Sequence, residues 1–372
     1  MDIPQEILNV FINFSEDDPQ TLLNLCLVSR RCASGAQKVL YRSIRITTHS
    51  SSVQHGSTCN VDAVSIKLFK TFTQHNPSLA KYVQTFSHHY ALPFGDRRYR
   101  NLANKSFQLM TNLESLTIFA RFSLDLFQGC TFQLKQLFCP LLGPDHTYRE
   151  KIYHFLSSQP YLKTLYIDME HSRLPADCCN NLETLWGNQR TIENILPGRS
   201  TITCLVWTTQ HHDHVAGPLS RISRELSNIH ILALGGNAPY PSLTQLVPYM
   251  RSLRVLRLVR KPQTNLSGGT YDELGCLPDL VNLRIFVWSA RPIGRFDGTE
   301  YGQSTVDQGR QRRLVTKWFR DMRVLEAAYF QIAARKDKPK NYLCWRRHEV
   351  DPAPVDSHEA VVQHGLAPRF SE

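Results

Sequence analysis

LESLTI at residues 113–118 sets the pattern from which the fold follows, apolar-x-x-Leu-x-apolar. The pattern begins again at residues 134, 162, 182, 202, 229, 253 and 280, with start-to-start spacings of 20 to 28 residues. The eight triplets are Leu113, Leu116 and Ile118; Leu134, Leu137 and Cys139; Leu162, Leu165 and Ile167; Leu182, Leu185 and Gly187; Ile202, Leu205 and Trp207; Ile229, Leu232 and Leu234; Leu253, Leu256 and Leu258; and Leu280, Leu283 and Ile285. Weaker matches flank them at Val83, Phe86 and His88 and at Met322, Leu325 and Ala327. Self-similarity at such a period indicates a chain of stacked structural units.

Each copy of the pattern predicts a short strand. The last two apolar residues alternate as on a strand and point inward, and segments such as 148–159 and 243–252 return along the opposite side. One such unit cannot bury its apolar face alone, whereas stacked units build a continuous core. The spacing resembles that of degenerate leucine-rich repeats, without a regular Asn in the turn after the strand. We therefore predict an α/β fold with an irregular solenoid over residues 61–290, and an ordinary α/β domain with Leu-rich strands is the alternative.

Residues 1–46 carry start signals for three short helices. Asp2 can cap a helix with Pro4 in its first turn, where the missing N–H costs nothing. Asp18 and Pro19 repeat this signal for the second helix, and Ser29 can cap a third that runs to about residue 41. Residues 22–28 are apolar nearly all round, more than one face of a small bundle can bury. Part of this apolar surface is therefore expected to meet a partner.

This N-terminal stretch resembles an F-box of the fungal type, most of all those of mushroom-type fungi. The matching residues are Ile3-Pro4, Glu6-Ile7-Leu8, Asp18-Pro19, Leu27-Val28-Ser29-Arg30, Leu40-Tyr41 and Ile44-Arg45-Ile46. Cys32 stands where the family often has Trp, so we expect a less tightly packed third helix. The resemblance implies a substrate-recognition subunit of an SCF-type ubiquitin ligase, in which the F-box binds a Skp-type adaptor and, through it, a cullin scaffold. The repeats would then hold a target protein.

The apolar residues of the F-box-like segment are the expected adaptor-binding residues. They are Pro4, Ile7, Leu8, Leu22, Leu23, Leu25 and Val28. Burying large apolar side chains of this kind against a partner stabilises a complex by roughly 1.5–3 kcal/mol each before the costs of association. A receptor of this class does no chemistry, because it acts by raising the local concentration of its target.

Segments without the repeat pattern are predicted at both ends of the repeats. Residues 47–60 are rich in Ser, Thr and His and indicate a linker. After them, apolar residues at helical spacing from Val61 to Phe72 predict an amphipathic helix that ends near Asn76-Pro77. At the other end, residues 291–350 predict a basic extension or cap, and residues 351–372 a flexible tail.

The basic extension supports a second hypothesis. Between Arg291 and Arg347 there are 14 lysines and arginines against 6 acidic residues, a net charge of +8. Basic residues flank Trp318 and Phe319 on one predicted helix, an arrangement that can bind nucleic acid or an acidic protein surface. The alternative is that the aromatic residues pack on the last repeat as a cap, with the basic residues solvated. A non-enzymatic basic scaffold is therefore the competing function.

Composition places the chain in an intracellular class. The sequence has 372 residues and a net charge of +11, which suggests acidic partners. Its N-terminus does not resemble a secretory signal, and no apolar run approaches the roughly 20 residues that span a bilayer. The ten cysteines include no C-x-x-C pair, so reduced core thiols are expected. These features predict a cytoplasmic or nuclear protein without a membrane segment.

No catalytic, metal or cofactor site is predicted. His211-His212-Asp213-His214 lacks a second ligand cluster, and Ser267-Gly268-Gly269-Thr270 lacks the Lys and spacing of a phosphate-binding loop. The sequence also has no G-x-S-x-G, H-E-x-x-H or D-x-D-x-D-G pattern. Both segments are interpreted as solvated loops or turns, and the chain as a non-enzyme.

Overall fold

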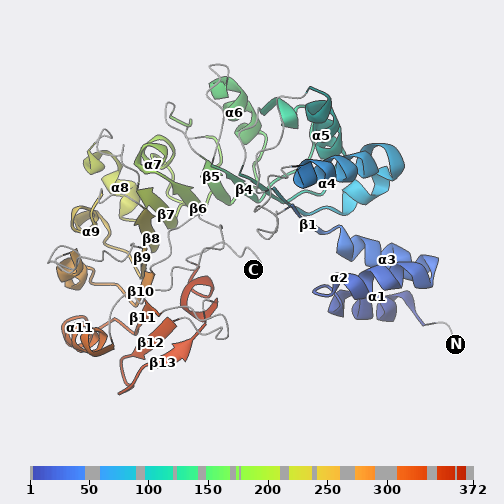
Figure 1. Cartoon of the computed structure of the whole chain (residues 1–372). Coiled ribbons are helices and arrows are strands. Elements are labelled where there is room, and N and C mark those ends of the chain that lie inside the picture. The colour runs from blue at the N-terminus through green and yellow to red at the C-terminus, as the bar shows by residue number, and fades with distance from the viewer. Residues whose placement is uncertain are drawn as a thin grey trace. The chain divides into compact units, whose positions relative to one another are not determined.

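The computed structural model describes residues 3–46, 59–88, 97–119, 124–140, 148–167, 173–175, 177–209, 218–236, 241–259, 273–289, 308–332, 342–356 and 358–365. The chain divides into two compact units. Unit 1 comprises Met1–Asp168 with Asp177–Asn181, and unit 2 comprises Met169–Ala176 with Leu182–Glu372. Each unit combines helices with a mainly parallel set of strands (Figure 1), so the chain is mixed α/β.

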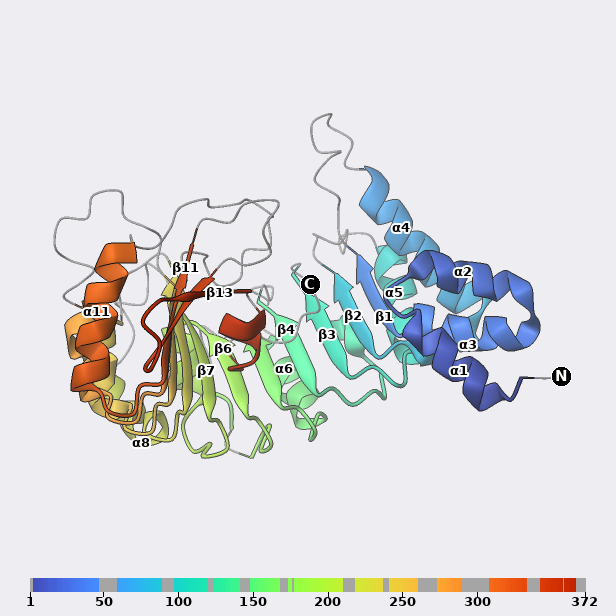
Figure 2. The ribbon, with the colours of Figure 1, turned by 90° about the horizontal axis from the view of Figure 1, so that it is seen from below.

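Unit 1 begins with three helices and continues into five parallel strands. The helices are α1 (Gln5–Phe14), α2 (Pro19–Val28) and α3 (Arg30–Leu40). The strands are β1 (Ser43–Ile46), β2 (Thr85–His88), β3 (Ser115–Ile118), β4 (Gln136–Cys139) and β5 (Thr164–Ile167), paired in that order. Between the strands lie α4 (Cys59–Lys70), α5 (Arg97–Leu109) and α6 (Tyr148–Ser157), with the short turns η2 (Thr71–His75), η3 (Pro77–Tyr82) and η4 (Leu124–Phe127). Figure 2 shows α1–α3 next to the β1 end of this unit.

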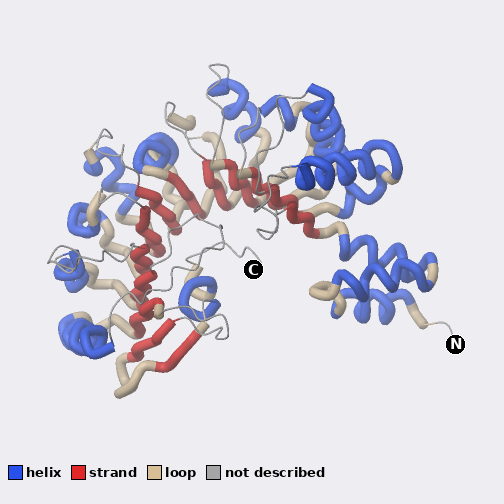
Figure 3. Tube along the Cα trace, in the orientation of Figure 1, coloured by secondary structure: helices blue, strands red, loops and turns tan. Residues whose placement is uncertain are grey.

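Unit 2 repeats the strand-and-return arrangement and closes with an antiparallel hairpin. Its parallel strands are β6 (Thr184–Gly187), β7 (Cys204–Thr209), β8 (Ile231–Gly236), β9 (Val255–Val259), β10 (Ile285–Ser289) and β11 (Ala327–Gln331). Strands β12 (Tyr342–Arg346) and β13 (Ala353–Val355) then add antiparallel to β11 and to each other. The returns are α7 (Gln189–Ile195), η6 (Leu219–Ile222), α8 (Ser223–Leu226), α9 (Leu243–Leu246), η7 (Val247–Tyr249), η8 (Glu273–Asp279) and α11 (Gln308–Asp321). Helices α7, α8, α9 and α11 lie along one face of these strands (Figure 3). We call the opposite face of the unit 2 strands the open face.

The strand prediction is confirmed for the first seven copies of the pattern, and the eighth leads into a strand in a different phase. Each copy leads into one of the strands β3 to β10, and the flanking matches lead into β2 and β11. In the copies that begin at 113 and 253, for example, all three apolar residues are buried. The repeats therefore build a leucine-rich-repeat-like core in each unit, as the stacking argument requires.

The phase of the last predicted copy was wrong by three residues. Phe286 lies opposite Leu256, and Trp288 lies opposite Leu258, so the inward triplet is Leu283, Phe286 and Trp288. Residues 280–285 and 283–288 both satisfy the apolar spacing, and a search for Leu favours the first. The same shift applies to the flanking match. Phe286 and Trp288 pair with Ala328 and Phe330, so the inward triplet there is Leu325, Ala328 and Phe330. The pairing register chooses between such phases because one face of the strand is buried.

Asparagine does support the repeats, but in the turn before the strand. The side chains of Asn112, Asn181 and Asn282 each donate to a backbone carbonyl of the preceding repeat, at 2.7, 2.8 and 2.8 Å. Each of them directly precedes the first Leu of its repeat. The predicted irregularity rested on the missing Asn after the strand and did not consider an Asn before it.

The three N-terminal helices begin as predicted at two of their three starts. Asp18 accepts a hydrogen bond from the N–H of Thr21 at 3.1 Å, and Ser29 accepts one from the N–H of Cys32 at 3.1 Å. Asp18 accepts two hydrogen bonds from Thr21, one from its hydroxyl and one from its N–H, and these hold the pKa of the Asp18 carboxyl below its usual range. The third predicted capping residue, Asp2, lies outside the described residues.

Two predicted boundaries change. Strand β1 follows the helices directly and pairs with β2, with Ile46 buried, so the repeat sheet of unit 1 begins inside the predicted F-box range 1–46. The predicted linker 47–60 ends earlier, because α4 begins at Cys59. This helix and the turn after it reach His75, which confirms the helix predicted up to Asn76-Pro77.

The C-terminal region is a folded part of unit 2. Trp318 on α11 packs edge-on against Phe286 and stacks on Phe330, with ring centroids 5.1 and 6.2 Å apart. This contact confirms that Trp318 packs on the last predicted repeat. The predicted flexible tail was wrong for residues 353–365, because β13 pairs with β12 and the turn η9 (His358–Val362) buries Ala360 and Val361. The segments 211–214 and 267–270, both predicted as solvated loops or turns, lie outside the described residues, as do residues 291–307 of the predicted basic extension.

Candidate protein-interaction surfaces

Helices α1 and α2 expose an unusual number of large apolar side chains. Eight of the thirteen large hydrophobic residues that are exposed in the described chain lie within residues 3–28. We call these eight the N-terminal apolar surface: Ile3, Ile7, Val10, Phe11, Phe14, Leu23, Leu27 and Val28. Phe14 and Leu27 are 85% and 86% exposed. An apolar concentration of this kind makes this part of the chain a candidate interaction surface.

Three of the seven expected adaptor-binding residues belong to this surface. Ile7, Leu23 and Val28 are exposed with it, and Pro4 is exposed at the start of α1. Leu22, by contrast, is 1% exposed and forms the bundle core with Ile12, Ala36 and Val39. It therefore stabilises the bundle and offers no surface to a partner.

Leu8 and Leu25 are partly buried against the same core, so they serve both packing and surface. Five further members of the apolar surface were not among the expected adaptor-binding residues: Val10, Phe11, Phe14, Leu27 and Ile3. The signal for the first three was the i, i+3, i+4, i+7 stripe that Ile7 begins. Cys32, in the place where Trp was expected, is buried in α3.

A basic pocket lies at the ends where strands β9 to β11 begin. Its volume is about 410 Å³, and it is lined by Arg254, Asn282, Arg284, Arg323, Val324, Glu326 and Arg347. Arg284 is paired with Glu326, the one acidic group in this lining. Four guanidinium groups around one carboxylate leave a local excess of positive charge for an acidic partner.

Arg347 is the most firmly held of these arginines. It donates to the carbonyls of Phe319 and Leu325 at 2.6 and 2.9 Å and to that of Met322. Its guanidinium also lies 5.3 Å from the ring centroid of Phe319. These contacts satisfy carbonyls at the end of α11, so Arg347 supports the cap as well as lining the pocket.

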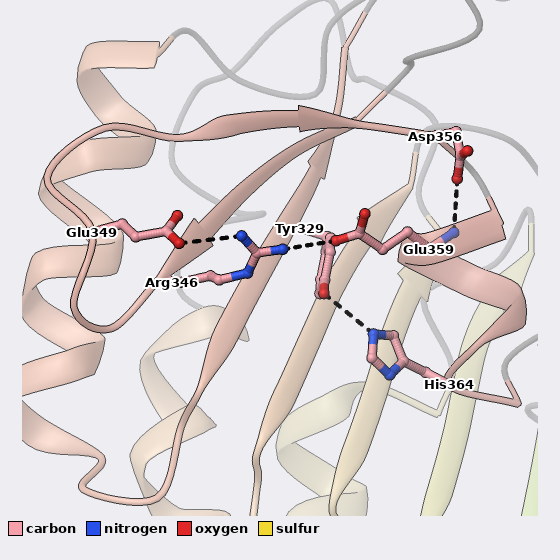
Figure 4. Close-up of polar contacts among 6 residues, drawn as sticks. All are labelled: Tyr329, Arg346, Glu349, Asp356, Glu359 and His364. Carbon is pink, nitrogen blue, oxygen red and sulfur yellow. Dashed lines mark hydrogen bonds and ion pairs between the residues drawn. The ribbon is translucent and has the colours of Figure 1, made fainter.

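Residues 353–365 form a C-terminal segment that lies on the open face of unit 2 (Figure 3). Figure 4 shows the polar contacts that hold it. Glu359 pairs with Arg346 of β12 at 2.9 Å, and the imidazole of His364 lies 3.3 Å from the hydroxyl of Tyr329 of β11. Asp356 accepts a hydrogen bond from the N–H of Glu359 at 2.8 Å and so starts the turn η9.

Burial perturbs the titratable groups under this segment. It raises the pKa of Tyr329 well above its usual range, and the neighbouring Cys344 adds to that rise. Burial also lowers the pKa of His364, while the carboxylate of Glu359 opposes this effect. The neutral forms of both rings are therefore favoured where the segment meets the strands.

A metal-ligand cluster or a reactive cysteine thiol in the described part of the chain would be a starting point for catalysis. No group of three or more His, Cys, Asp or Glu residues in the described chain is placed to hold a metal ion. Burial raises the pKa of Cys130 to about 12 and that of Cys204 to about 11, which disfavours the reactive thiolate. Among the helices of the described ranges, none has the length and hydropathy needed to cross a membrane.

Comparisons with known proteins add only distant structural similarity. No family model and no curated protein matches the chain. Among solved structures, it is similar to the leucine-rich repeat-containing protein LegL7 from Legionella pneumophila, with 12% identity over 66% of this chain and 81% of that chain, at a TM-score of 0.37. The strand registers described above, rather than this similarity, define the repeats.

Proposed function

We propose that this chain is the substrate-recognition subunit of an SCF-type ubiquitin ligase. In this proposal the N-terminal apolar surface binds a Skp-type adaptor that links the chain to a cullin scaffold, and the repeats hold a target protein. The chain itself does no chemistry and works in the cytoplasm or the nucleus. Its contribution is the high effective concentration of the target near a ubiquitin-charged enzyme.

The observation that carries the proposal is the exposure of the eight residues of the N-terminal apolar surface. They lie on a small bundle whose own core is already filled by Ile12, Leu22, Ala36 and Val39. Apolar side chains that remain exposed after the core is complete are best explained by a partner that buries them. Together with the sequence resemblance of residues 1–46 to an F-box, this favours an adaptor.

The test is co-purification of the full chain with a Skp-type adaptor and a cullin. Removing residues 1–46 would also remove β1 from the sheet, so point variants give the cleaner experiment. Val28→Asp changes a side chain that is 69% exposed on α2, and Val281→Asp makes the same change at a side chain that is 67% exposed outside the bundle. We expect Val28→Asp, and still more Leu27→Asp, to abolish co-purification, and Val281→Asp to leave it unchanged.

Equal recovery of the adaptor by wild type and Leu27→Asp would count against the proposal. Circular dichroism of the Val28→Asp and Leu27→Asp chains serves as the folding control. We expect both to fold, because both side chains are on the surface. The partly buried Leu8 makes a poorer test, since Leu8→Asp is expected to disturb the bundle as well as the surface.

The basic pocket of unit 2 favours a second candidate, a non-enzymatic scaffold that binds an acidic protein or nucleic acid. Binding driven by phosphate contacts weakens steeply with salt, whereas docking through apolar side chains does not. A titration with single-stranded nucleic acid at 50 and 200 mM salt distinguishes the two candidates. Arg254→Glu with Arg323→Glu should abolish binding if the pocket is responsible, while Arg100→Glu on α5 is the control.

A further inference from the structure

The C-terminal segment crosses several strands of the open face. Strand β13 pairs with β12 through Val355, Pro354 and Ala353. Farther along, the backbone carbonyl of Gly365 lies 3.6 Å from the thiol of Cys204 on β7. The segment therefore extends a sheet edge at one end and reaches β7 at the other. Strand addition to a sheet edge combined with side-chain contacts is a recurring mode of peptide recognition.

One ion pair indicates which charge a segment bound to the open face should carry. Arg346 contacts two carboxylates, that of Glu349 in the turn between β12 and β13 at 3.2 Å and that of Glu359 in the segment at 2.9 Å. Glu349 lies only three residues after Arg346 and belongs to the same hairpin. The pair with Glu359 is the contact through which an arriving or departing segment would be recognised.

Small apolar side chains follow this acidic residue. Ala360 and Val361 are buried directly after Glu359, and Val355 is buried before it. At Gly365 the backbone adopts a φ of +69°, and a Cβ there would lie 3.2 Å from Cδ1 of Ile231 on β8. The face therefore accepts a carboxylate, two small apolar residues and a close backbone approach.

The hold on the segment is modest. Its three buried apolar side chains are small, and the ion pair is partly exposed to solvent at both partners. Exposed ion pairs contribute little, whereas ordering each residue of the segment costs conformational entropy. A segment held in this way can be exchanged for another that makes the same contacts.

We infer that the open face of unit 2 is a docking surface for a peptide segment of a target protein, which carries an acidic residue followed directly by a small and a β-branched apolar residue. The chain's own residues 353–365 occupy this surface, and the target segment replaces them. That the incoming segment belongs to a target rests on the proposed function. The docking itself involves only unit 2 and needs no adaptor.

The experiment measures binding of a fluorescein-labelled synthetic peptide of residues 353–365 to the full chain by fluorescence anisotropy, without adaptor. Wild type is compared with Val361→Asp and Glu359→Arg, which each weaken the hold on the chain's own segment. Glu349→Arg is the matched control, because it removes the other carboxylate of Arg346 without changing the segment. We expect both segment variants to bind the peptide at least tenfold more tightly than wild type, and Glu349→Arg to behave as wild type.

A charge exchange tests the recognition itself. The Arg346→Glu chain should bind a peptide that carries the Glu359→Arg change and should fail to bind the unchanged peptide. If both segment variants fold, by thermal unfolding, and neither binds the peptide, or if wild type binds it equally well, the inference is overturned. Loss of adaptor binding in the Leu27→Asp chain leaves this assay untouched, so the two proposals can fail separately.

Discussion

Helices α1 and α11 each carry an apolar stripe, and the two stripes have different fates. On α11, Val315 and Trp318 are buried against unit 2. On α1, Ile7, Phe11 and Phe14 remain exposed in the described part of the chain. The comparison teaches that a stripe alone does not identify an interaction surface. What identifies it is a stripe left over after the neighbouring core is complete.

The largest expected difference between the two stripes concerns stability. Trp318→Ala should destabilise unit 2 by about 3–5 kcal/mol, because it removes a buried ring that contacts Phe286 and Phe330. Phe14→Ala, at the exposed stripe of α1, should change stability by no more than about 0.5 kcal/mol. Hydrogen exchange at increasing urea concentration measures both, at the amides of β10 and β11 for unit 2 and at the amides of α1 to α3 for the bundle. Similar losses in the two variants would show that the bundle surface is packed within the chain.

A second prediction separates the core of the bundle from its surface. A Cβ added at Gly35 of α3 would lie 2.6 Å from Cδ1 of Ile12, so Gly35→Ala should overpack the core by about 1–3 kcal/mol. The gain in helix propensity, about 0.5–1 kcal/mol, offsets part of this cost. The double variant Gly35→Ala with Ile12→Val should recover stability, as measured by thermal unfolding of the bundle. A fully neutral Gly35→Ala would contradict the close approach of α1 and α3.

The smallest expected effect is a pH dependence of the C-terminal segment. Burial lowers the pKa of His364, so the undocked segment binds a proton more readily than the docked one. Docking is therefore at full strength above the ordinary histidine pKa of about 6.5 and weakens as the pH falls through it. Tyr329 contacts this imidazole, and the carboxylate of Glu359, itself paired with Arg346, reduces the effect. Hydrogen exchange of residues 358–365, corrected for intrinsic rates, should rise between pH 7.5 and 5.5.

His364→Gln is the control for this last prediction. It keeps a polar side chain next to Tyr329 and removes the titration, so exchange should become independent of pH in this range. An unchanged pH dependence in His364→Gln would assign the effect to another group.

Sequence by itself determined the features that depend on near neighbours along the chain. Asp18 and Ser29 start their helices because each bonds an N–H three residues ahead. The strands β3 to β10 follow from apolar alternation, which has the same meaning wherever the repeat lies. The packing of Trp318 on the last repeat was one of two interpretations of the sequence, and its contact with Phe286 supports that interpretation.

Only the tertiary structure decided the features that depend on distant partners. Leu22 and Leu27 belong to one apolar run and look alike in sequence, yet the position of α3 buries the first and leaves the second exposed. The phase of the repeat at Leu283 was decided by its pairing with β9. The polar, Pro-containing segment 353–365 was predicted to be flexible. Its contacts, Gly365 with β7 and β8 and Glu359 with Arg346, join it to strands that no local pattern can place beside it.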